Sequence, residues 1–147
     1  MLKRVRLKIE SVIDNLSPAG LPEGESEKSV NEAVGALRIN DGVITLTYTE
    51  STESGEVRSE IICRDKEVTV RRSGAIESEL LFIEGQIHRS VYSIPPYRFY
   101  AAVKAKRVRI DVGENEGKID LVYNMMIGGA EKAARMKIWI LQASNQN

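Results

Sequence analysis

The stretch Leu37-Arg38-Ile39-Asn40-Asp41-Gly42-Val43-Ile44-Thr45-Leu46-Thr47-Tyr48 decides the fold class of this chain. Apolar and polar residues alternate on both sides of Asp41-Gly42, which is the period-two pattern of a half-buried β-strand. Asp-Gly favours a two-residue type I′ turn, because both central positions of that turn need positive φ. Such a loop sets Ile39 opposite Ile44 and Leu37 opposite Leu46. The stretch therefore predicts an antiparallel hairpin with one apolar face.

The same alternation recurs along the whole chain, as in Val5/Leu7/Ile9, Val68/Val70, Val108/Ile110/Val112, Ile119/Leu121/Tyr123 and Met136/Ile138/Ile140. Gly128-Gly129 predicts another two-residue hairpin, which sets Leu121 opposite Met136. Helix-forming composition is confined to residues 130–135, which run directly into an alternating strand. A long antiparallel meander avoids open edges by curling closed. We therefore predict an all-β, closed antiparallel up-and-down barrel of about ten strands, with less than about a tenth of its residues in helix.

Two further turns fix the faces of the strands beside them. Glu84-Gly85, taken as a two-residue loop, sets Phe82 opposite Ile87. A two-residue loop at Ser73-Gly74 would oppose Val70 to a glutamate, so parity favours the three-residue loop 72–74 with Val70 opposite Ile76. That loop predicts positive φ at Gly74 and places Arg72 on a rim of the barrel.

The 147 residues are read as one domain, with two segments outside the barrel. Residues 17–29 contain two prolines, two glycines and several acids, so we expect a mobile loop at 15–29. The tail at 142–147 is polar, and we expect it to be frayed. Pro95-Pro96 must leave the ladder, because proline has no N–H to donate.

Composition excludes several classes of protein. Hydrophobic residues make up 42% and charged residues 29%, as in a globular domain. Lys+Arg and Asp+Glu both total 21, and this neutral balance argues against nucleic-acid binding. No stretch approaches the roughly 18 apolar residues of a membrane span, so no membrane is expected as a partner. Cys63 is the only cysteine and the first residues form no apolar signal run, so we expect a cytoplasmic protein.

Five segments of the chain carry a family resemblance: residues 5–11, 68–78, 82–85, 88–92 and 117–121. They resemble the DUF1934 family of uncharacterised bacterial proteins, most specifically in the Arg72-Ser73-Gly74-Ala75 turn followed by Phe82-x-x-Gly85 and Tyr92. The resemblance implies a calycin-like (lipocalin-like) barrel and no established activity. Family members usually carry Thr-Pro-Tyr-Gly after the tyrosine, whereas this chain has residues 93–98, Ser-Ile-Pro-Pro-Tyr-Arg, and lacks the glycine.

The inventory of reactive side chains predicts no enzyme, no metal and no cofactor. His88 and Cys63 are single and lie on different strands, without the spacing of metal ligands. We expect an exposed His88 and a buried, inert Cys63. Carboxylates are plentiful but fall on outward faces or turns, where they stay solvated and are poor general acids.

Arg89 is the least ordinary residue of the sequence. The Glu84-Gly85 hairpin carries Arg89 onto the apolar face, opposite Leu80 and near Ser78, and an unpaired charge inside a barrel is costly. It would then anchor a bound anion, or it would extend to the rim or pair with an internal acid. The candidate ligand-binding residues are Arg89, Ser78, Arg72, Tyr92, Tyr97 and Phe99. The last three would line the mouth, or they would only cap one end of the barrel.

These residues leave two functions open. The first is binding of a small amphipathic or anionic ligand, such as a fatty-acid-like anion, inside the barrel. The alternative is a protein-interaction module or homodimer that uses an outer barrel face, so the chain is expected to be a monomer or a homodimer. A cavity of roughly 300 Å³ or more favours the ligand, while a filled interior and an exposed apolar patch favour the partner.

Overall fold

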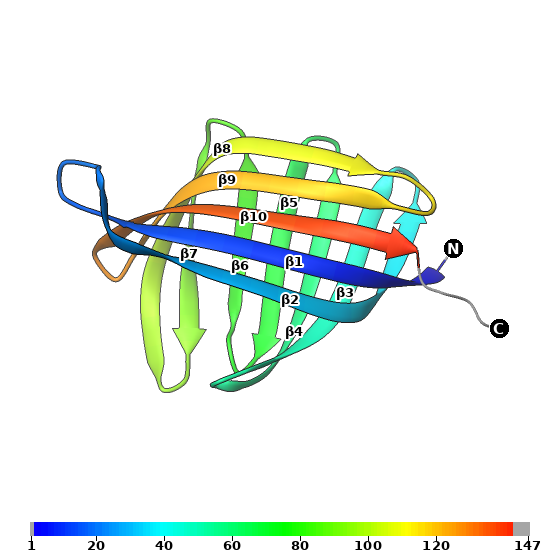
Figure 1. Cartoon of the computed structure of the whole chain (residues 1–147), viewed down its shortest axis with the longest axis horizontal. Helices are drawn as coiled ribbons and strands as arrows, with labels where there is room; N and C mark the ends of the chain where they lie inside the picture. Colours follow the sequence, from blue (N-terminus) through cyan, green and yellow to red (C-terminus); the bar gives the residue numbers. More distant parts are fainter. Residues whose placement is uncertain (1, 143–147) are drawn as a thin grey trace.

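The structure, a computed structural model, describes residues 2–142 and arranges them as one antiparallel sheet that curls into a nearly closed barrel (Figure 1). Its strands are β1 (Leu2–Leu16), β2 (Pro22–Asn40), β3 (Val43–Thr52), β4 (Gly55–Arg64), β5 (Glu67–Gly74), β6 (Ser78–Ile83), β7 (Ile87–Ile94), β8 (Tyr97–Val112), β9 (Gly117–Ile127) and β10 (Ala130–Gln142). The strand order in the sheet is β6-β5-β4-β3-β2-β1-β10-β9-β8-β7. The predicted all-β up-and-down barrel is confirmed, and residues 2–142 contain no helix able to cross a membrane. The predicted frayed tail lies, from residue 143 onward, outside the described residues.

Two predicted hairpins form with the predicted registers. Ile39 pairs with Ile44 and Leu37 with Leu46 across the Asp41-Gly42 turn, where both turn residues have positive φ. Leu121 pairs with Met136 across Gly128-Gly129, and residues 130–135 belong to β10. Because alternate residues of each strand face the interior, strands from all around the barrel contribute to the core. Its largest fully buried side chains include Phe82, Leu7, Leu46, Ile61, Ile119, Leu121, Ile138 and Ile140. Their burial is the main source of stability.

The connection between β5 and β6 is longer than predicted. Val70 pairs with Leu80, not with Ile76, and Arg72 pairs with Ser78. The register therefore differs by four residues from the predicted one, an even number that leaves every side chain on its predicted face. Gly74 has a φ of +103°, which confirms the predicted positive φ.

Most of the predicted loop at 15–29 is strand. β2 begins at Pro22, which pairs with Leu16, and only residues 17–21 form the turn. The Ser17 and Leu21 backbones are joined across this turn by a 2.8 Å hydrogen bond from the N–H of Ser17. Pro22 fits because the first residue of a strand can lack a donor, and the polar residues that follow stay exposed while their backbones pair. The β1–β2 hairpin extends beyond the barrel wall (Figure 1).

The barrel is incomplete between β6 and β7, along a line that we call the seam. The two strands are linked at one end by a single bridge, in which Glu77 and Ser93 exchange two backbone hydrogen bonds of 2.8 Å. At the other end Gln86 N–H donates to the Ile83 carbonyl at 2.9 Å. No ladder joins β6 to β7 between these points, so the predicted closure is only partial. Because backbone groups alternate along a strand, those of Arg89 and Val91 face the seam, as Ser93 does.

Candidate functional site

A row of polar side chains crosses the interior on four neighbouring strands. Tyr48 of β3 pairs with Ser59 of β4, and Ser59 pairs with Arg72 of β5. Arg72 pairs in turn with Ser78 of β6. Each of these residues shares the alternation phase of buried apolar neighbours in its own strand, so all of them face the interior. With Tyr123 of β9, which is also buried, they form what we call the interior polar cluster.

Three hydroxyl groups of the interior polar cluster are buried without a partner. Ser59 is 0%, Tyr48 4% and Ser78 7% exposed. Within residues 2–142, none of these three hydroxyls makes a hydrogen bond of ordinary geometry, although Ser59 lies close enough to the Tyr48 hydroxyl to lower its pKa against the larger effect of burial. A buried hydroxyl that finds no partner costs about 1–3 kcal/mol, so this arrangement favours a bound polar group.

Arg72 supplies the charge of the interior polar cluster. Burial raises the pKa values of Tyr48 and Tyr123, and the nearby positive charge of Arg72 offsets part of both increases. The guanidinium therefore lies close to hydroxyls from both sides of the barrel. Among the described residues, no carboxylate lies within 4.0 Å of it.

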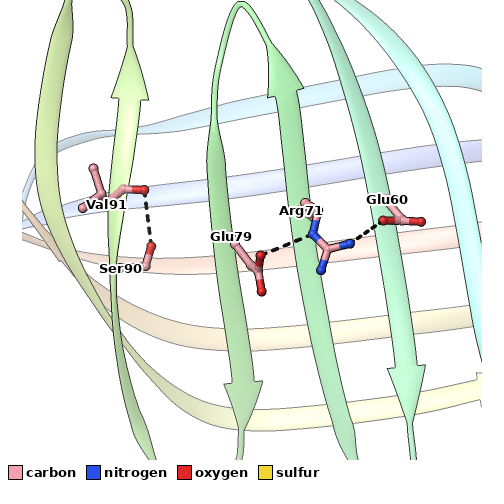
Figure 2. Close-up of polar contacts among 5 residues, drawn as sticks. All are labelled: Glu60, Arg71, Glu79, Ser90 and Val91. Atoms are coloured by element: carbon pink, nitrogen blue, oxygen red, sulfur yellow. Dashed lines mark hydrogen bonds and ion pairs between the residues drawn. The ribbon is translucent and has the colours of Figure 1, made fainter.

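Arg71, the residue before Arg72, differs from it in forming ion pairs. Arg71 points to the outer wall, where its guanidinium contacts Glu60 at 2.9 Å and Glu79 at 3.3 Å (Figure 2). Because alternate residues face opposite sides of a strand, Arg72 cannot reach these carboxylates. In addition to the larger effect of burial, Glu50 lies near enough to Tyr48 to raise its pKa, and it accepts a 3.3 Å hydrogen bond from Asn31. Arg71 is thus neutralised by two glutamates, whereas Arg72 has no carboxylate within 4.0 Å among the described residues.

The interior beneath the cluster is filled. The next inward row consists of Leu46, Ile61, Val70 and Leu80, all at most 4% exposed. Below it Phe82 meets the Tyr123 ring edge-on, with centroids 4.8 Å apart. The cluster can therefore accept a polar group only from the mouth or from the seam.

The structure brings together three of the six predicted site residues. Arg72 and Ser78 are paired in the cluster, and Tyr92 lies near enough to Tyr123 to raise its pKa slightly against the larger effect of burial. Tyr97 is 65% exposed at the start of β8. Phe99 is 37% exposed and would lie 3.3 Å from a Cβ added at Gly128, so it covers the β9–β10 turn at the mouth.

The predicted position of Arg89 is wrong. Its side chain is exposed on the outer wall, as are those of Ile87 and Val91. The Glu77–Ser93 bridge sets a register that opposes Ile83, not Phe82, to Ile87, so the loop holds three residues. A slip of one residue turns a whole strand over. The same slip makes His88 half-buried, against the expectation that it is exposed.

The candidate residues named from the sequence do not include three members of the cluster, although the alternation carries a signal for them. Tyr48 shares its phase with Leu46, Ser59 with Ile61, and Tyr123 with Leu121. The alternation therefore indicates that these polar residues face the interior. Only the register between the strands shows that they lie next to one another.

Other chemistry finds little support in the described residues. Residues 2–142 contain no group of three His, Cys, Asp or Glu side chains that could hold a metal ion. Cys63 is 2% exposed, and burial raises the pKa of its thiol to about 12. A thiol of this kind is a poor nucleophile.

A surface hollow of about 300 Å³ includes Tyr48 of the cluster in its lining, with Gly35, Thr47 and Arg58. Two others contain no residue of the cluster. One of about 240 Å³ at the opposite end is lined by Lys3, Leu37, Ile39 and Glu114. Another of about 290 Å³ lies on the outer wall and is lined by Arg107, Arg109, Asp111, Lys118, Asp120 and Arg135.

The geometry defines an antiparallel barrel with a polar cluster inside and, within residues 2–142, no group of three His, Cys, Asp or Glu side chains able to hold a metal ion. The family model described as "Domain of unknown function (DUF1934)" matches residues 19–140, and the chain belongs to this family. A relative is the "Uncharacterized beta-barrel protein YwiB" of Bacillus subtilis (strain 168), which is 23% identical over 128 residues, 87% of this chain and 85% of the relative. The crystal structure of that B. subtilis protein matches with a TM-score of 0.85 at 22% identity and covers 97% of this chain and 94% of its own. This likeness supports the barrel fold.

Proposed function

We propose that this barrel binds a small anion-bearing molecule at the interior polar cluster, with Arg72 as the anchor. The observation that carries the proposal is a half-buried guanidinium that meets no carboxylate in the described residues and lies beside unpartnered hydroxyls. Arginine presents several N–H donors in a fixed fork, which matches a carboxylate or phosphate. The hydroxyls of Tyr48, Ser59 and Ser78 add further donors on the same face.

Packing limits the size and orientation of such a ligand. The apolar rows below the cluster leave no room for a long chain, so an acyl tail would point toward the mouth. Tyr92 and Phe99 pair with each other on neighbouring strands there and offer apolar surface to it. Short carboxylates and phosphate monoesters therefore fit better than full-length fatty acids.

Calorimetric titration tests this proposal with acetate, butyrate, octanoate, inorganic phosphate and a phosphate monoester as probes. Arg72→Met removes the charge and keeps an apolar stem, and we expect it to weaken binding by about 1.5–3 kcal/mol, roughly 10- to 150-fold. Arg72→Lys should recover only part of the affinity, because an ammonium lacks the fork. Arg89→Met is the matched control on the outer wall. An equal loss in the two methionine variants, or a wild-type protein that binds none of the probes, refutes the proposal.

We propose binding without catalysis, in the cytoplasm. The high pKa of the Cys63 thiol supports the first part, since it leaves no ready nucleophile at that position. The single free cysteine supports the second, because disulfide frameworks are typical of oxidising compartments.

A filled interior below the cluster and exposed apolar side chains on an outer face both support a second candidate, a homodimer. Ile87 and Val91 of β7, Tyr100 of β8 and Met126 of β9 are 55%, 37%, 86% and 49% exposed. Val91 pairs with Tyr100, and Ala102 pairs with Met126, so apolar side chains reach across three strands, with the exposed charges of Arg89 and Lys104 on the same face. Light scattering of wild type and Tyr100→Glu would show a dimer that the substitution dissociates; a wild-type monomer at all concentrations excludes it.

A further inference from the structure

The outer wall of β1, β10, β9 and β8 concentrates positive charge on a chain whose net charge is zero. These four strands lie side by side (Figure 1). We call the following residues the basic wall: Lys8, Arg107, Arg109, Lys118, Arg135 and Lys137, with Trp139 among them. Neutral composition conceals this surface, because exposed acids such as Glu23, Glu25 and Glu27 lie on the β1–β2 hairpin instead.

Trp139 is the centre of the basic wall. It pairs with Lys8 on one side and Lys118 on the other, while Lys137 precedes it by two residues on the same face. The three ammonium nitrogens lie 5.2, 5.9 and 5.7 Å from the ring centroid, in the order Lys8, Lys118, Lys137. Attraction to the ring stabilises each cation, but like charges this close repel one another. An anion placed between them would remove that repulsion.

Three carboxylates share this face: Glu10 is paired with Lys137 and Asp111 with Lys118 in the strand register, and Asp120 is paired with both Lys137 and Arg109. Lys8 contacts Glu10 at 3.5 Å, whereas Lys118 and Lys137 form no ion pair within residues 2–142. Asp120 is 5% exposed and is held by two hydrogen bonds, of 3.1 and 3.3 Å, from Arg135. Burial raises the pKa of this carboxyl, but Arg135, Lys137 and Arg107 together lower it, so its charge is shared among three cations of the basic wall.

A groove continues the basic wall beyond the tryptophan. It has a volume of about 290 Å³, and its cationic lining is Arg107, Arg109, Lys118 and Arg135, against the acids Asp111 and Asp120. Arg107 and Arg109 make no ion pair in the described part of the chain. Free guanidinium groups thus lie next to the ring of lysines around Trp139.

We propose that the basic wall binds single-stranded nucleic acid, with a base that displaces the lysine ammonium groups from the exposed part of the Trp139 ring and stacks there, while the phosphates pair with these lysines and the nearby arginines. Proteins that hold single strands combine a cationic track with an aromatic platform, and both are present here. A membrane surface fits less well, because Trp139 is half-buried within the sheet and does not protrude as an inserting side chain does. This site is separate from the interior polar cluster.

Trp139 is the only tryptophan of the chain, so its fluorescence reports on the site directly. We expect oligo(U) and oligo(dT) of twelve nucleotides to quench it to saturation. With three to four phosphate contacts, affinity should fall about 20- to 50-fold between about 50 and 200 mM salt. Uridine oligomers that bind more tightly than thymidine oligomers would assign RNA, and the reverse would assign DNA; either supports the proposal.

Variants keep the test specific. Lys118→Gln with Lys137→Gln should weaken binding about 10-fold and flatten the salt dependence. Arg58→Gln with Lys66→Gln removes the same charge from exposed positions elsewhere and should have little effect. The proposal is overturned if no oligomer quenches the fluorescence or if the two double variants lose affinity equally. It is also overturned if an abasic oligomer or phosphatidylglycerol vesicles quench the fluorescence as strongly.

Discussion

Gly74→Ala is the substitution whose cost can be worked most directly from the structure. Gly74 ends β5 with a φ of +103°, a conformation that side chains with a Cβ rarely adopt. A Cβ built there would lie 2.6 Å from the carbonyl oxygen of Glu56. That oxygen cannot withdraw freely, because it accepts a 2.9 Å hydrogen bond from the Ala75 N–H.

Two costs therefore add at this position. The left-handed backbone costs a non-glycine residue about 1–2 kcal/mol. Forcing an extra carbon against a fixed backbone atom costs about 1–3 kcal/mol more. We expect a total loss of about 2–5 kcal/mol, a large share of the roughly 5–15 kcal/mol that a domain of this kind has in all.

Gly85→Ala is the matched control. Gly85 also has positive φ, at +80°, but a Cβ there would meet no atom within 4 Å. It should lose only the backbone cost of about 1–2 kcal/mol. In urea unfolding with a slope near 2 kcal/mol/M, the Gly74 variant should reach its midpoint about 0.5–1.5 M below the control. Equal midpoints for the two variants would refute the clash with Glu56.

Three further predictions concern buried groups. Ser59→Ala should leave thermal stability unchanged or raise it by up to about 1 kcal/mol, because the lost hydroxyl has no partner in the described residues; a fall of similar size would contradict this. Cys63, with a thiol pKa of about 12, should resist a disulfide reagent at about pH 8 in the native state and react only after denaturant is added. For Asp120, burial alone would raise the pKa, but the hydrogen bond and charge of Arg135, together with the charges of Lys137 and Arg107, outweigh it and lower the pKa of the folded state. Its stabilisation is therefore present above about pH 4 and is lost as pH falls further, so acid unfolding of Asp120→Asn should lack that part of the pH dependence.

The barrel could be predicted because its signals are local and repeated. Asp41-Gly42 and Gly128-Gly129 each fix both a turn and a register, and the alternation around them agrees with the faces that the turns require. The register predicted after Arg72 differs from the observed one by four residues. Because four is an even number, the side chains of the two strands still lie on their predicted faces.

The site could not be predicted in the same way, because the face on which the residues of β7 lie depends on whether Gln86 belongs to the preceding loop. Glu84-Gly85 also suits a two-residue turn, and nothing local shows that Gln86 belongs to the loop as well. That single residue moved Arg89 to the outer wall and left Arg72 as the interior arginine. The basic wall cannot be predicted from the net charge, because the net charge is a sum over the chain, whereas a folded sheet separates charged residues by strand and by face.

The pairing of β1 with β10 has a consequence for how the chain folds during synthesis. Leu7 pairs with Ile140, so one edge of β1 has no partner until nearly the whole chain has been made. Strands β1 to β6 can form hairpins as they leave the ribosome, yet the wall can close only when β10 follows. Until then the nascent sheet presents the free edge of β1, with Val5, Leu7 and Ile9 on its apolar face, to other chains. Production of this protein should therefore depend on chaperones that protect emerging strands, even though the finished barrel has little exposed edge outside the seam.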